Sequence, residues 1–364
     1  MAGSTIGTIF TVTTWGESHG KGVGAVVDGC PAGLPLSESD IQKFLDRRKP
    51  GQNRYTTARM EKDEVEILSG IFEGKTTGTP ISLLVRNTDQ RSRDYSEIAG
   101  YYRPGHADYT FDQKYGFRDY RGGGRSSGRE TIGRVAAGAI ASKILNELGI
   151  TLCTYTKSIG PVQAEVFDPA HINTDPLYMA DSSASEKAQA YLKECMANQD
   201  SAGGVIECIV KGLPAGVGDP VFNKLDALLG KAIFSIGAVK AVEIGDGTAA
   251  AAANGSSNND TFCCDNEGVI RKTTNHAGGI LGGISDGSDL ILRAYVKPTA
   301  SISSLQDTVN KDGENIKVRI KGRHDPVIVP RAVVVVESMT ALTLIDALLG
   351  GMGARMENLI KIWK

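Results

Sequence analysis

Val27-Asp-Gly-Cys-Pro-Ala-Gly33 recurs as Val210-Lys-Gly-Leu-Pro-Ala-Gly216, at a spacing close to half of the 364-residue chain. A run rich in β-branched residues precedes each copy, and an amphipathic stretch follows it. The first amphipathic stretch covers residues 37–49, with Ser37 as the expected N-cap and the apolar side chains on one face. The second covers about 220–236, with a proline near its first turn. This echo predicts two related strand-helix-strand units.

A second echo has the same spacing. Val65-Glu-Ile67 recurs as Val242-Glu-Ile244, and a glycine follows shortly after each copy. We therefore predict a single domain over residues 1–364, with pseudo-repeated halves at approximately 1–190 and 191–364 that share one core. A chance recurrence of short Gly-Pro turns is the alternative interpretation.

Strand-like and helix-like segments mix without regular alternation, which favours an α+β fold over a doubly wound sheet. Alanine-, glycine- and asparagine-rich residues 248–260 are expected to form a surface loop. The expected strands are 8–13, 80–86, 203–210, 290–296, 316–321 and 327–337. The expected helices are 130–148 and 340–349.

The composition is typical of a globular enzyme, with 41% hydrophobic and 23% charged residues. The net charge of −2 makes an extended nucleic-acid-binding face improbable, because such faces carry a basic balance. No stretch reaches the roughly 18 to 20 uncharged apolar residues of a membrane span, and the N-terminus lacks the features of a signal peptide. The six cysteines have no CxxC spacing, so we expect reduced thiols and a cytoplasmic protein.

Six arginines and a glycine run are concentrated between Arg103 and Arg134. The two densest parts read Arg103-Pro-Gly-His-Ala-Asp-Tyr-Thr110 and Asp119-Tyr-Arg-Gly-Gly-Gly-Arg-Ser-Ser-Gly-Arg-Glu-Thr131. Arginine stays charged and presents a planar fork of donors that matches phosphate and carboxylate groups. A helix N-terminus directly after the glycines would add its own unpaired N–H groups. The segment therefore predicts a site for a small anionic ligand.

Two of the five histidines lie close to glycine and to a carboxylate. His19 lies in Trp15-Gly-Glu-Ser-His-Gly20, and His106 lies in the arginine-rich segment. Histidine is the side chain best suited to proton transfer near neutral pH. Neither histidine has the i, i+4 partner of a helical metal site, so we expect no metal.

Three further segments carry glycine, lysine or arginine after expected strands. They are Asn275-His-Ala-Gly-Gly-Ile-Leu-Gly-Gly-Ile-Ser-Asp-Gly287, Lys297-Pro-Thr-Ala-Ser301, and Arg323-His-Asp-Pro326 with Arg331 just beyond. Basic residues at the ends of several separate strands indicate convergence on one pocket.

The chain resembles the chorismate synthase family over most of its length. The matching segments are Gly16–Gly20, Asp46–Gly51, Arg54–Thr57, Asn87–Ser92, Arg103–Thr110, Asp119–Thr131, Asn275–Gly287, Lys297–Ser301 and Arg323–Pro326. The resemblance implies helices sandwiched with antiparallel sheets. It also implies a lyase that eliminates phosphate from 5-enolpyruvylshikimate-3-phosphate to give chorismate, the last step of the shikimate pathway. The family requires reduced FMN although the reaction has no net redox change.

The resemblance also implies roles for individual residues. His106 would protonate the reduced flavin or keep it protonated, His19 would supply a proton near the departing phosphate, and we expect Asp346 to relay the proton received at the flavin. The implied flavin-binding residues are Arg125, Ser126, Ser127, Gly237, Ala238, Gly282, Lys297, Pro298, Thr299, Ala300, Ser301 and Arg323. The implied substrate-binding residues are Arg48, Arg54, Arg129, Arg134 and Arg331.

Some expectations remain open at this point. Ala300 stands where the family commonly has serine, and Gly237 where it commonly has asparagine. Neither change removes a charged or titrating group, so we expect an altered affinity for FMN and no other effect. An Arg-Gly nucleic-acid-binding module is an alternative function, which the net charge opposes. A bifunctional enzyme that also reduces FMN with NADPH is a second alternative; NADPH is expected only in that role. The resemblance implies a homotetramer.

Overall fold

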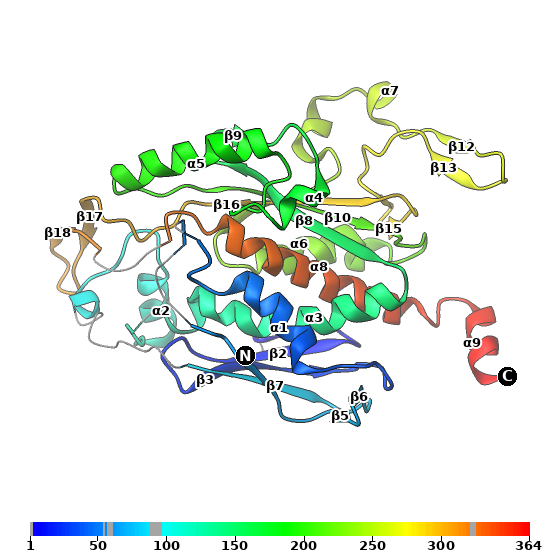
Figure 1. Ribbon diagram of the computed structural model, residues 1–364, viewed down its shortest axis with the longest axis horizontal. Coiled ribbons are helices and arrows are strands. Elements are labelled where there is room, and N and C mark those ends of the chain that lie inside the picture. The colour runs from blue at the N-terminus through cyan, green and yellow to red at the C-terminus, as the bar shows by residue number, and fades with distance from the viewer. Residues whose placement is uncertain (1–2, 54, 57–60, 88–96, 122, 321–324) are drawn as a thin grey trace.

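Two antiparallel five-stranded sheets enclose a layer of helices in the computed structural model (Figure 1). The structure describes residues 3–53, 55, 56, 61–87, 97–121, 123–320 and 325–364. The first sheet consists, in spatial order, of β1 (Thr5–Ile6), β2 (Thr11–Gly16), β3 (Gly22–Asp28), β7 (Ile81–Arg86) and β4 (Val65–Ile67). The second consists of β11 (Val239–Ile244), β16 (Leu290–Val296), β10 (Gly204–Lys211), β8 (Thr151–Ile159) and β9 (Val162–Gln163).

Four helices fill the space between the sheets, and smaller elements lie around them. The central helices are α1 (Glu38–Arg48), α3 (Thr131–Glu147), α6 (Leu225–Phe234) and α8 (Val329–Gly351). The peripheral helices are α2 (Asp108–Tyr115), α4 (Pro169–Ile172), α5 (Ser182–Ala197), α7 (Gly255–Asn258) and α9 (Met356–Trp363). The hairpins are β5–β6 (Ile71–Phe72, Lys75–Thr76), β12–β13 (Phe262–Cys264, Ile270–Lys272), β14–β15 (Ile280–Leu281, Ile284–Ser285) and β17–β18 (Gln306–Val309, Asn315–Val318). The expected α+β class is confirmed.

The two sheets share one connectivity. The order β2, β3, α1, β4, β7, α3 in the first half corresponds to β8, β10, α6, β11, β16, α8 in the second, and equivalent strands occupy equivalent positions. We propose that the halves are pseudo-repeats, and this shared order supports the proposal. The second sheet begins with β8 at residue 151, so a division by sheets lies near residue 150 rather than near 190.

The repeated Val-x-Gly-x-Pro-Ala-Gly sequence builds the same turn after equivalent strands. Gly29 follows β3 with φ of 77°, and Gly212 follows β10 with φ of 79°. A Cβ atom would lie 1.9 Å from the Ile9 carbonyl oxygen at the first position and 2.4 Å from the Gly149 carbonyl oxygen at the second. Glycine is required at both positions because the left-handed backbone and the close approach both exclude a side chain.

The predicted strand over 327–337 is wrong, because these residues open the long helix α8. The run Val333–Val336 has high β propensity, which produced the strand prediction. All four valines are buried, and burial of α8 against the second sheet and the helices α1, α3 and α6 outweighs their small helix penalty of about half a kcal/mol each. Helix α8 is long and apolar enough to cross a membrane by composition, yet 67% of its most apolar window is buried inside the protein, as expected of a core helix.

Helices α3 and α8 approach each other closely at a pair of small residues. A Cβ atom on Gly138 of α3 would lie 2.2 Å from the Cβ atom of Ser338 on α8. The flanking residues Ala137 and Ala139 of α3 are also buried. The absent side chain at Gly138 therefore sets the distance between the two central helices.

Gly138→Ala is expected to lower the free energy of unfolding by about 1–3 kcal/mol, because the added methyl group overpacks the contact with Ser338. The matched control is Gly230→Ala in α6, where a Cβ atom would meet nothing within 4 Å. That change should stabilise the protein by about 0.5–1 kcal/mol through helix propensity. Urea unfolding of both variants measures the difference, and equal effects would contradict the close-packing argument.

Candidate active site

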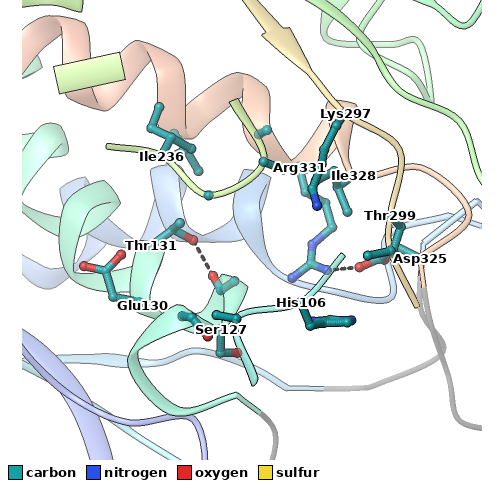
Figure 2. Close-up of a pocket in the computed structure, with 18 of the residues that line it drawn as sticks. His106, Ser127, Glu130, Thr131, Ile236, Lys297, Thr299, Asp325, Ile328 and Arg331 are labelled. Carbon is teal, nitrogen blue, oxygen red and sulfur yellow. Dashed lines mark hydrogen bonds and ion pairs between the residues drawn. The ribbon is translucent and has the colours of Figure 1, made fainter. Parts of the chain in front are cut away.

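A cavity of about 580 Å³ opens where the first turns of α3 and α8 meet the last residues of α1 and α6 (Figure 2). Its wall combines residues 105–107, 125–128, 130, 131, 134, 235–238, 297–300, 325, 328, 331, 332 and 335 with Arg48. The structure therefore brings the arginine-rich segment of the first half against the basic strand ends of the second half, as the sequence indicated.

Most of the site residues expected from the sequence lie on this wall. They are Arg48, His106, Arg125, Ser126, Ser127, Arg134, Gly237, Ala238, Lys297, Pro298, Thr299, Ala300 and Arg331. The expected residues that do not line it are His19, Arg129, Gly282, Ser301 and Asp346. Arg54 and Arg323 lie outside the described residues.

Glu130 holds two arginines of the wall in place. Its carboxylate accepts a 2.8 Å hydrogen bond from Arg134 Nε and lies 3.8 Å from the Arg125 guanidinium. Arg125 also donates to Thr14 Oγ1 at 2.7 Å, and Arg134 donates to Ser235 Oγ at 2.6 Å. These bonds fix both guanidinium groups before any ligand arrives.

Arg331 and Arg48 form the opposite part of the wall. Arg331 donates to Asp325 Oδ2 at 2.6 Å and to the Arg48 carbonyl oxygen at 3.0 Å. Burial lowers the pKa of Arg331, against the opposing effect of Asp325. Arg48 Nε is buried and has no hydrogen-bond partner within the described chain. Both observations indicate positive charge that an anion in the cavity would stabilise.

The start of α3 differs from the bare helix N-terminus that the sequence suggested. Two 3₁₀ turns, η3 (Gly124–Ser126) and η4 (Gly128–Glu130), precede the helix. They occupy the N–H groups of Ser126 and Ser127, which donate to the Gly123 and Gly124 carbonyls. Donors for an anion therefore come from side chains such as Arg125 more than from free backbone groups.

The turn that carries His106 is fastened to the segment after β16. Lys297 Nζ donates to the Gly105 carbonyl at 2.8 Å, and His106 Nε2 lies 2.6 Å from Ser301 Oγ. Ser301 is buried behind the wall, so its role in the structure is to hold the His106 ring. An Arg103–Asp108 ion pair at 2.8 Å closes the other end of the turn.

His19 lies in the loop after β2 and is not among the residues that line the cavity. Asn87 Nδ2 donates to the carbonyls of Glu17 and Gly20, at 3.0 and 2.9 Å, and so fixes both ends of the loop. A hydrogen bond from Arg121 holds the pKa of Asp119 below its usual value, and the nearby His19 ring adds to this effect. Within the described residues, His19 thus faces the arginine-rich segment.

Two predicted residues lie away from the cavity. Asp346 lies in the second half of α8, and its carboxylate accepts hydrogen bonds from the backbone N–H groups of Thr8, Ile9 and Phe10 at 2.7–3.0 Å. Gly282 is in the β14–β15 turn, which packs beside Lys224 at the opposite end of α6. The structure brings neither residue to the cavity of its own chain.

Sequence reasoning missed two acidic residues of the wall. Asp325 belongs to the Arg323-His-Asp-Pro326 segment that the resemblance rests on, so that segment could have identified it. Glu130 lies between two predicted arginines, and its i, i+4 spacing to Arg134 was a second usable signal.

Comparison with known proteins agrees with this architecture. The model of the family described as "Chorismate synthase" matches residues 10–349. The chain belongs to the chorismate synthase family. It is 65% identical to chorismate synthase from Lachnoclostridium phytofermentans and 66% identical to that from Agathobacter rectalis, over the full length of each protein. Identity to chorismate synthase from Chloroflexus aurantiacus is 54% over 96% of both chains.

A solved structure described as "Crystal Structure of Chorismate Synthase" superposes with a TM-score of 0.76 and 32% identity, covering 98% of this chain and 96% of the other. Chorismate synthases are lyases of the shikimate pathway that convert 5-enolpyruvylshikimate-3-phosphate into chorismate and phosphate, and this is the activity of the chain. The family match ends at residue 349, so α9 lies beyond it.

Asp108→Asn should destabilise the protein by about 3–5 kcal/mol near neutral pH, because the buried guanidinium group of Arg103 loses its counter-charge, whereas the nearby Arg118 keeps its 2.8 Å ion pair with Asp112. Burial alone would raise the pKa of Asp108, but hydrogen bonds and charge from Arg103 hold it below its usual value. The stabilisation is therefore complete above the unfolded-state pKa of about 4 and is lost as the pH falls through the lower folded-state pKa.

Urea unfolding of the wild type and this variant, at neutral pH and at progressively lower pH, measures the difference. The difference in the free energy of unfolding between the wild type and Asp108→Asn should become smaller as the pH is lowered. Asp265→Asn is the control, because that carboxylate binds Arg271 at the surface, and its loss should change stability little. A gap that is independent of pH would contradict the assignment to Asp108.

Proposed function

We propose that the cavity is the site where 5-enolpyruvylshikimate-3-phosphate loses its phosphate. The observation that carries the proposal is the convergence of Arg48, Arg125, Arg134 and Arg331 on one pocket, with Arg48 Nε buried and unpartnered among the described residues. The substrate bears a phosphate and two carboxylates, and each charge-assisted hydrogen bond contributes about 1.5–3 kcal/mol. The volume of about 580 Å³ lies within the range of small-molecule sites.

Reduced FMN is the cofactor that we propose for this cavity. Thr299 Oγ1 is buried there without a hydrogen-bond partner in the described chain, and Lys297 and Ser126 line the same wall. Gly237 leaves open space where a side chain would stand. This set of polar side chains beside the open space at Gly237 fits a phosphate-bearing flavin. When bound, reduced FMN supplies electron density to the substrate as phosphate leaves and recovers it as hydrogen departs.

The arginines of the wall bind the anionic groups and stabilise the charge that develops on the departing phosphate. Arg134 and Arg331 are held by Glu130 and Asp325, so they need no reorganisation during the reaction. Arg129 lies behind the wall and acts on the site through its neighbours.

His106 is the proposed proton donor at the flavin. Its Nε2 atom is paired with Ser301 Oγ, which fixes the ring beside the cavity. His19 remains our proposal for the proton near the departing phosphate. Its loop follows Gly16, whose carbonyl accepts a hydrogen bond from the Arg125 guanidinium, and this bond links the loop to the wall.

We transfer the proposed proton relay from Asp346 to Asp325, because Asp325 lines the cavity and Asp346 is occupied by three backbone N–H groups. Asp325→Asn should lower kcat at least tenfold, as expected on loss of a proton-transfer group. Asp346→Asn should lower the unfolding temperature and leave kcat near the wild-type value. Steady-state kinetics and thermal unfolding of both variants test this assignment. A large loss of kcat in Asp346→Asn, with kcat of Asp325→Asn near the wild-type value, would assign the proton relay to Asp346 instead.

We further propose a cytoplasmic homotetramer. Helix α9 exposes several large apolar side chains on one short element, among them Met356 at 70%, Ile360 at 48% and Trp363 at 81%, and a clustered apolar surface of this kind is typical of a protein–protein interface. Sedimentation equilibrium measures the mass directly.

The deciding experiment is anaerobic turnover of 5-enolpyruvylshikimate-3-phosphate with chemically reduced FMN, followed by a repeat with NADPH and oxidised FMN. We expect chorismate in the first reaction and none in the second, because no dinucleotide fingerprint occurs in the sequence. Turnover in the second reaction would show an additional flavin reductase activity. Absence of chorismate from both would refute the proposed site.

A further inference from the structure

Four charged side chains, two arginines and two carboxylates, form a buried cluster that reaches the cavity wall at Arg48 and otherwise lies behind it. Asp63 Oδ2 accepts from Arg48 NH2 at 2.5 Å, and Asp63 Oδ1 accepts from Arg129 NH1 at 3.2 Å. Glu61 pairs with the same Arg129 guanidinium. The exposed fraction of the Asp63 side chain is 0%, and that of Arg48 is 2%. Asp63 is thus the carboxylate that joins the two arginines.

A contribution to the stability of the fold does not by itself explain why such a cluster is present. The cost of removing charges from water roughly cancels their attraction, so apolar residues of similar volume often serve equally well. The backbone at Asp63 is also in the left-handed region, with φ of 49°. Left-handed conformations of residues other than glycine are uncommon and tend to occur at functional sites.

The position of Asp63 is fixed from helix α1, which also carries Arg48. Gln42 Nε2 donates to the Asp63 carbonyl at 3.3 Å, and Gln42 Oε1 accepts from Val65 N at 3.2 Å. The bend at Asp63 is therefore clamped against the same helix whose last residue reaches the cavity. This arrangement aims the carboxylate at the Arg48 guanidinium.

One side of the cluster lies at the cavity, where Arg48 lines the wall. Arg48 NH1 donates to the Gly128 carbonyl at 3.3 Å, and NH2 is held by Asp63, so Nε is the part of the guanidinium without a partner in the described chain. The Arg48 carbonyl in turn accepts from Arg331 Nε. The Arg48 side chain and the Arg48 backbone thus each contribute to the wall, and Asp63 acts on the side chain.

The other side of the cluster reaches the His19 loop. Arg129 Nε donates to Asn87 Oδ1 at 3.0 Å, and Asn87 Nδ2 donates to the two carbonyls that bound the loop. A continuous series of hydrogen bonds therefore leads from Arg48 through Asp63, Arg129 and Asn87 to the residues on either side of His19.

We propose that Asp63 is a positioning residue of the active site: its carboxylate orients Arg48 toward the anionic substrate and, through Arg129 and Asn87, holds the His19 loop. Asp63 itself lies behind the wall and does not touch the substrate. The inference rests on the proposed function, because it assigns the cavity to a phosphorylated, carboxylate-bearing substrate.

Asp63→Asn tests the proposal, because it keeps the shape of the side chain and removes its charge. Loss of one well-placed charge-assisted contact should raise the KM for 5-enolpyruvylshikimate-3-phosphate about tenfold or more. The cluster also changes from neutral to a charge of +1. Inorganic phosphate, which needs no oriented fork, should therefore inhibit the variant several-fold more strongly than the wild type.

Two further variants separate positioning from folding. Asp175→Asn removes a carboxylate that is similarly buried and accepts from Leu177 N, Met179 N and Ser185 Oγ, away from the cavity wall. It should lower the unfolding temperature without changing KM or phosphate inhibition. Asp63→Glu keeps the charge, so phosphate inhibition should stay near the wild-type value while KM rises. It also serves as the test if Asp63→Asn does not fold.

The outcomes are distinct. A KM and a phosphate inhibition constant that stay at wild-type values in both Asp63 variants, with only the unfolding temperature changed, would show that Asp63 is merely structural. Failure of the wild type to form chorismate with reduced FMN would refute the proposed function instead. Calorimetric titration with inorganic phosphate then still measures whether Asp63 changes the affinity of the cavity arginines for phosphate, because binding requires no turnover.

Discussion

The close contact between α3 and α8 at Gly138 and Ser338 is the constraint on which the rest of the structure depends. Both helices begin at the cavity, and each carries an arginine of the wall in or near its first turn, Arg134 on α3 and Arg331 on α8. The helix spacing therefore sets the distance between these two guanidinium groups. A larger residue at Gly138 would change the separation of the helices and, with it, the width of the anion site.

The wall illustrates how carboxylates and carbonyls allow several arginines to lie close together. Each guanidinium has a carboxylate or a carbonyl beside it: Glu130 serves Arg125 and Arg134, Asp325 serves Arg331, and Asp63 serves Arg48. These carboxylates reduce the repulsion between neighbouring guanidinium groups and fix the orientation of each one. The positive charge that they do not neutralise faces the cavity. A preorganised site of this kind stabilises charge in a departing group without reorganisation at the moment of reaction.

The fold class, the strands that precede the turn glycines, and most of the wall could be predicted from the sequence, because each left a local signal. The repeated turn at Gly29 and Gly212 is one such signal, since its backbone conformation demands glycine. The strand prediction over 327–337 was wrong because valine propensity is local, whereas the helix depends on burial against the second sheet and the neighbouring helices. Asp63 could not be predicted, because its partners Arg48 and Arg129 are brought to it only by the tertiary fold.

The hydrogen bonds between Asp346 and residues 8–10 have a consequence for how the chain acquires its structure. They join residues separated by more than 330 positions, so the N-terminal edge of the first sheet is completed by a carboxylate near the end of the chain. Contacts of such long sequence separation form late and slow folding, because a very long loop must close first. An emerging chain would therefore hold its first strands in an unfinished state until α8 has been synthesised, and assembly of this domain is tied to completion of the polypeptide.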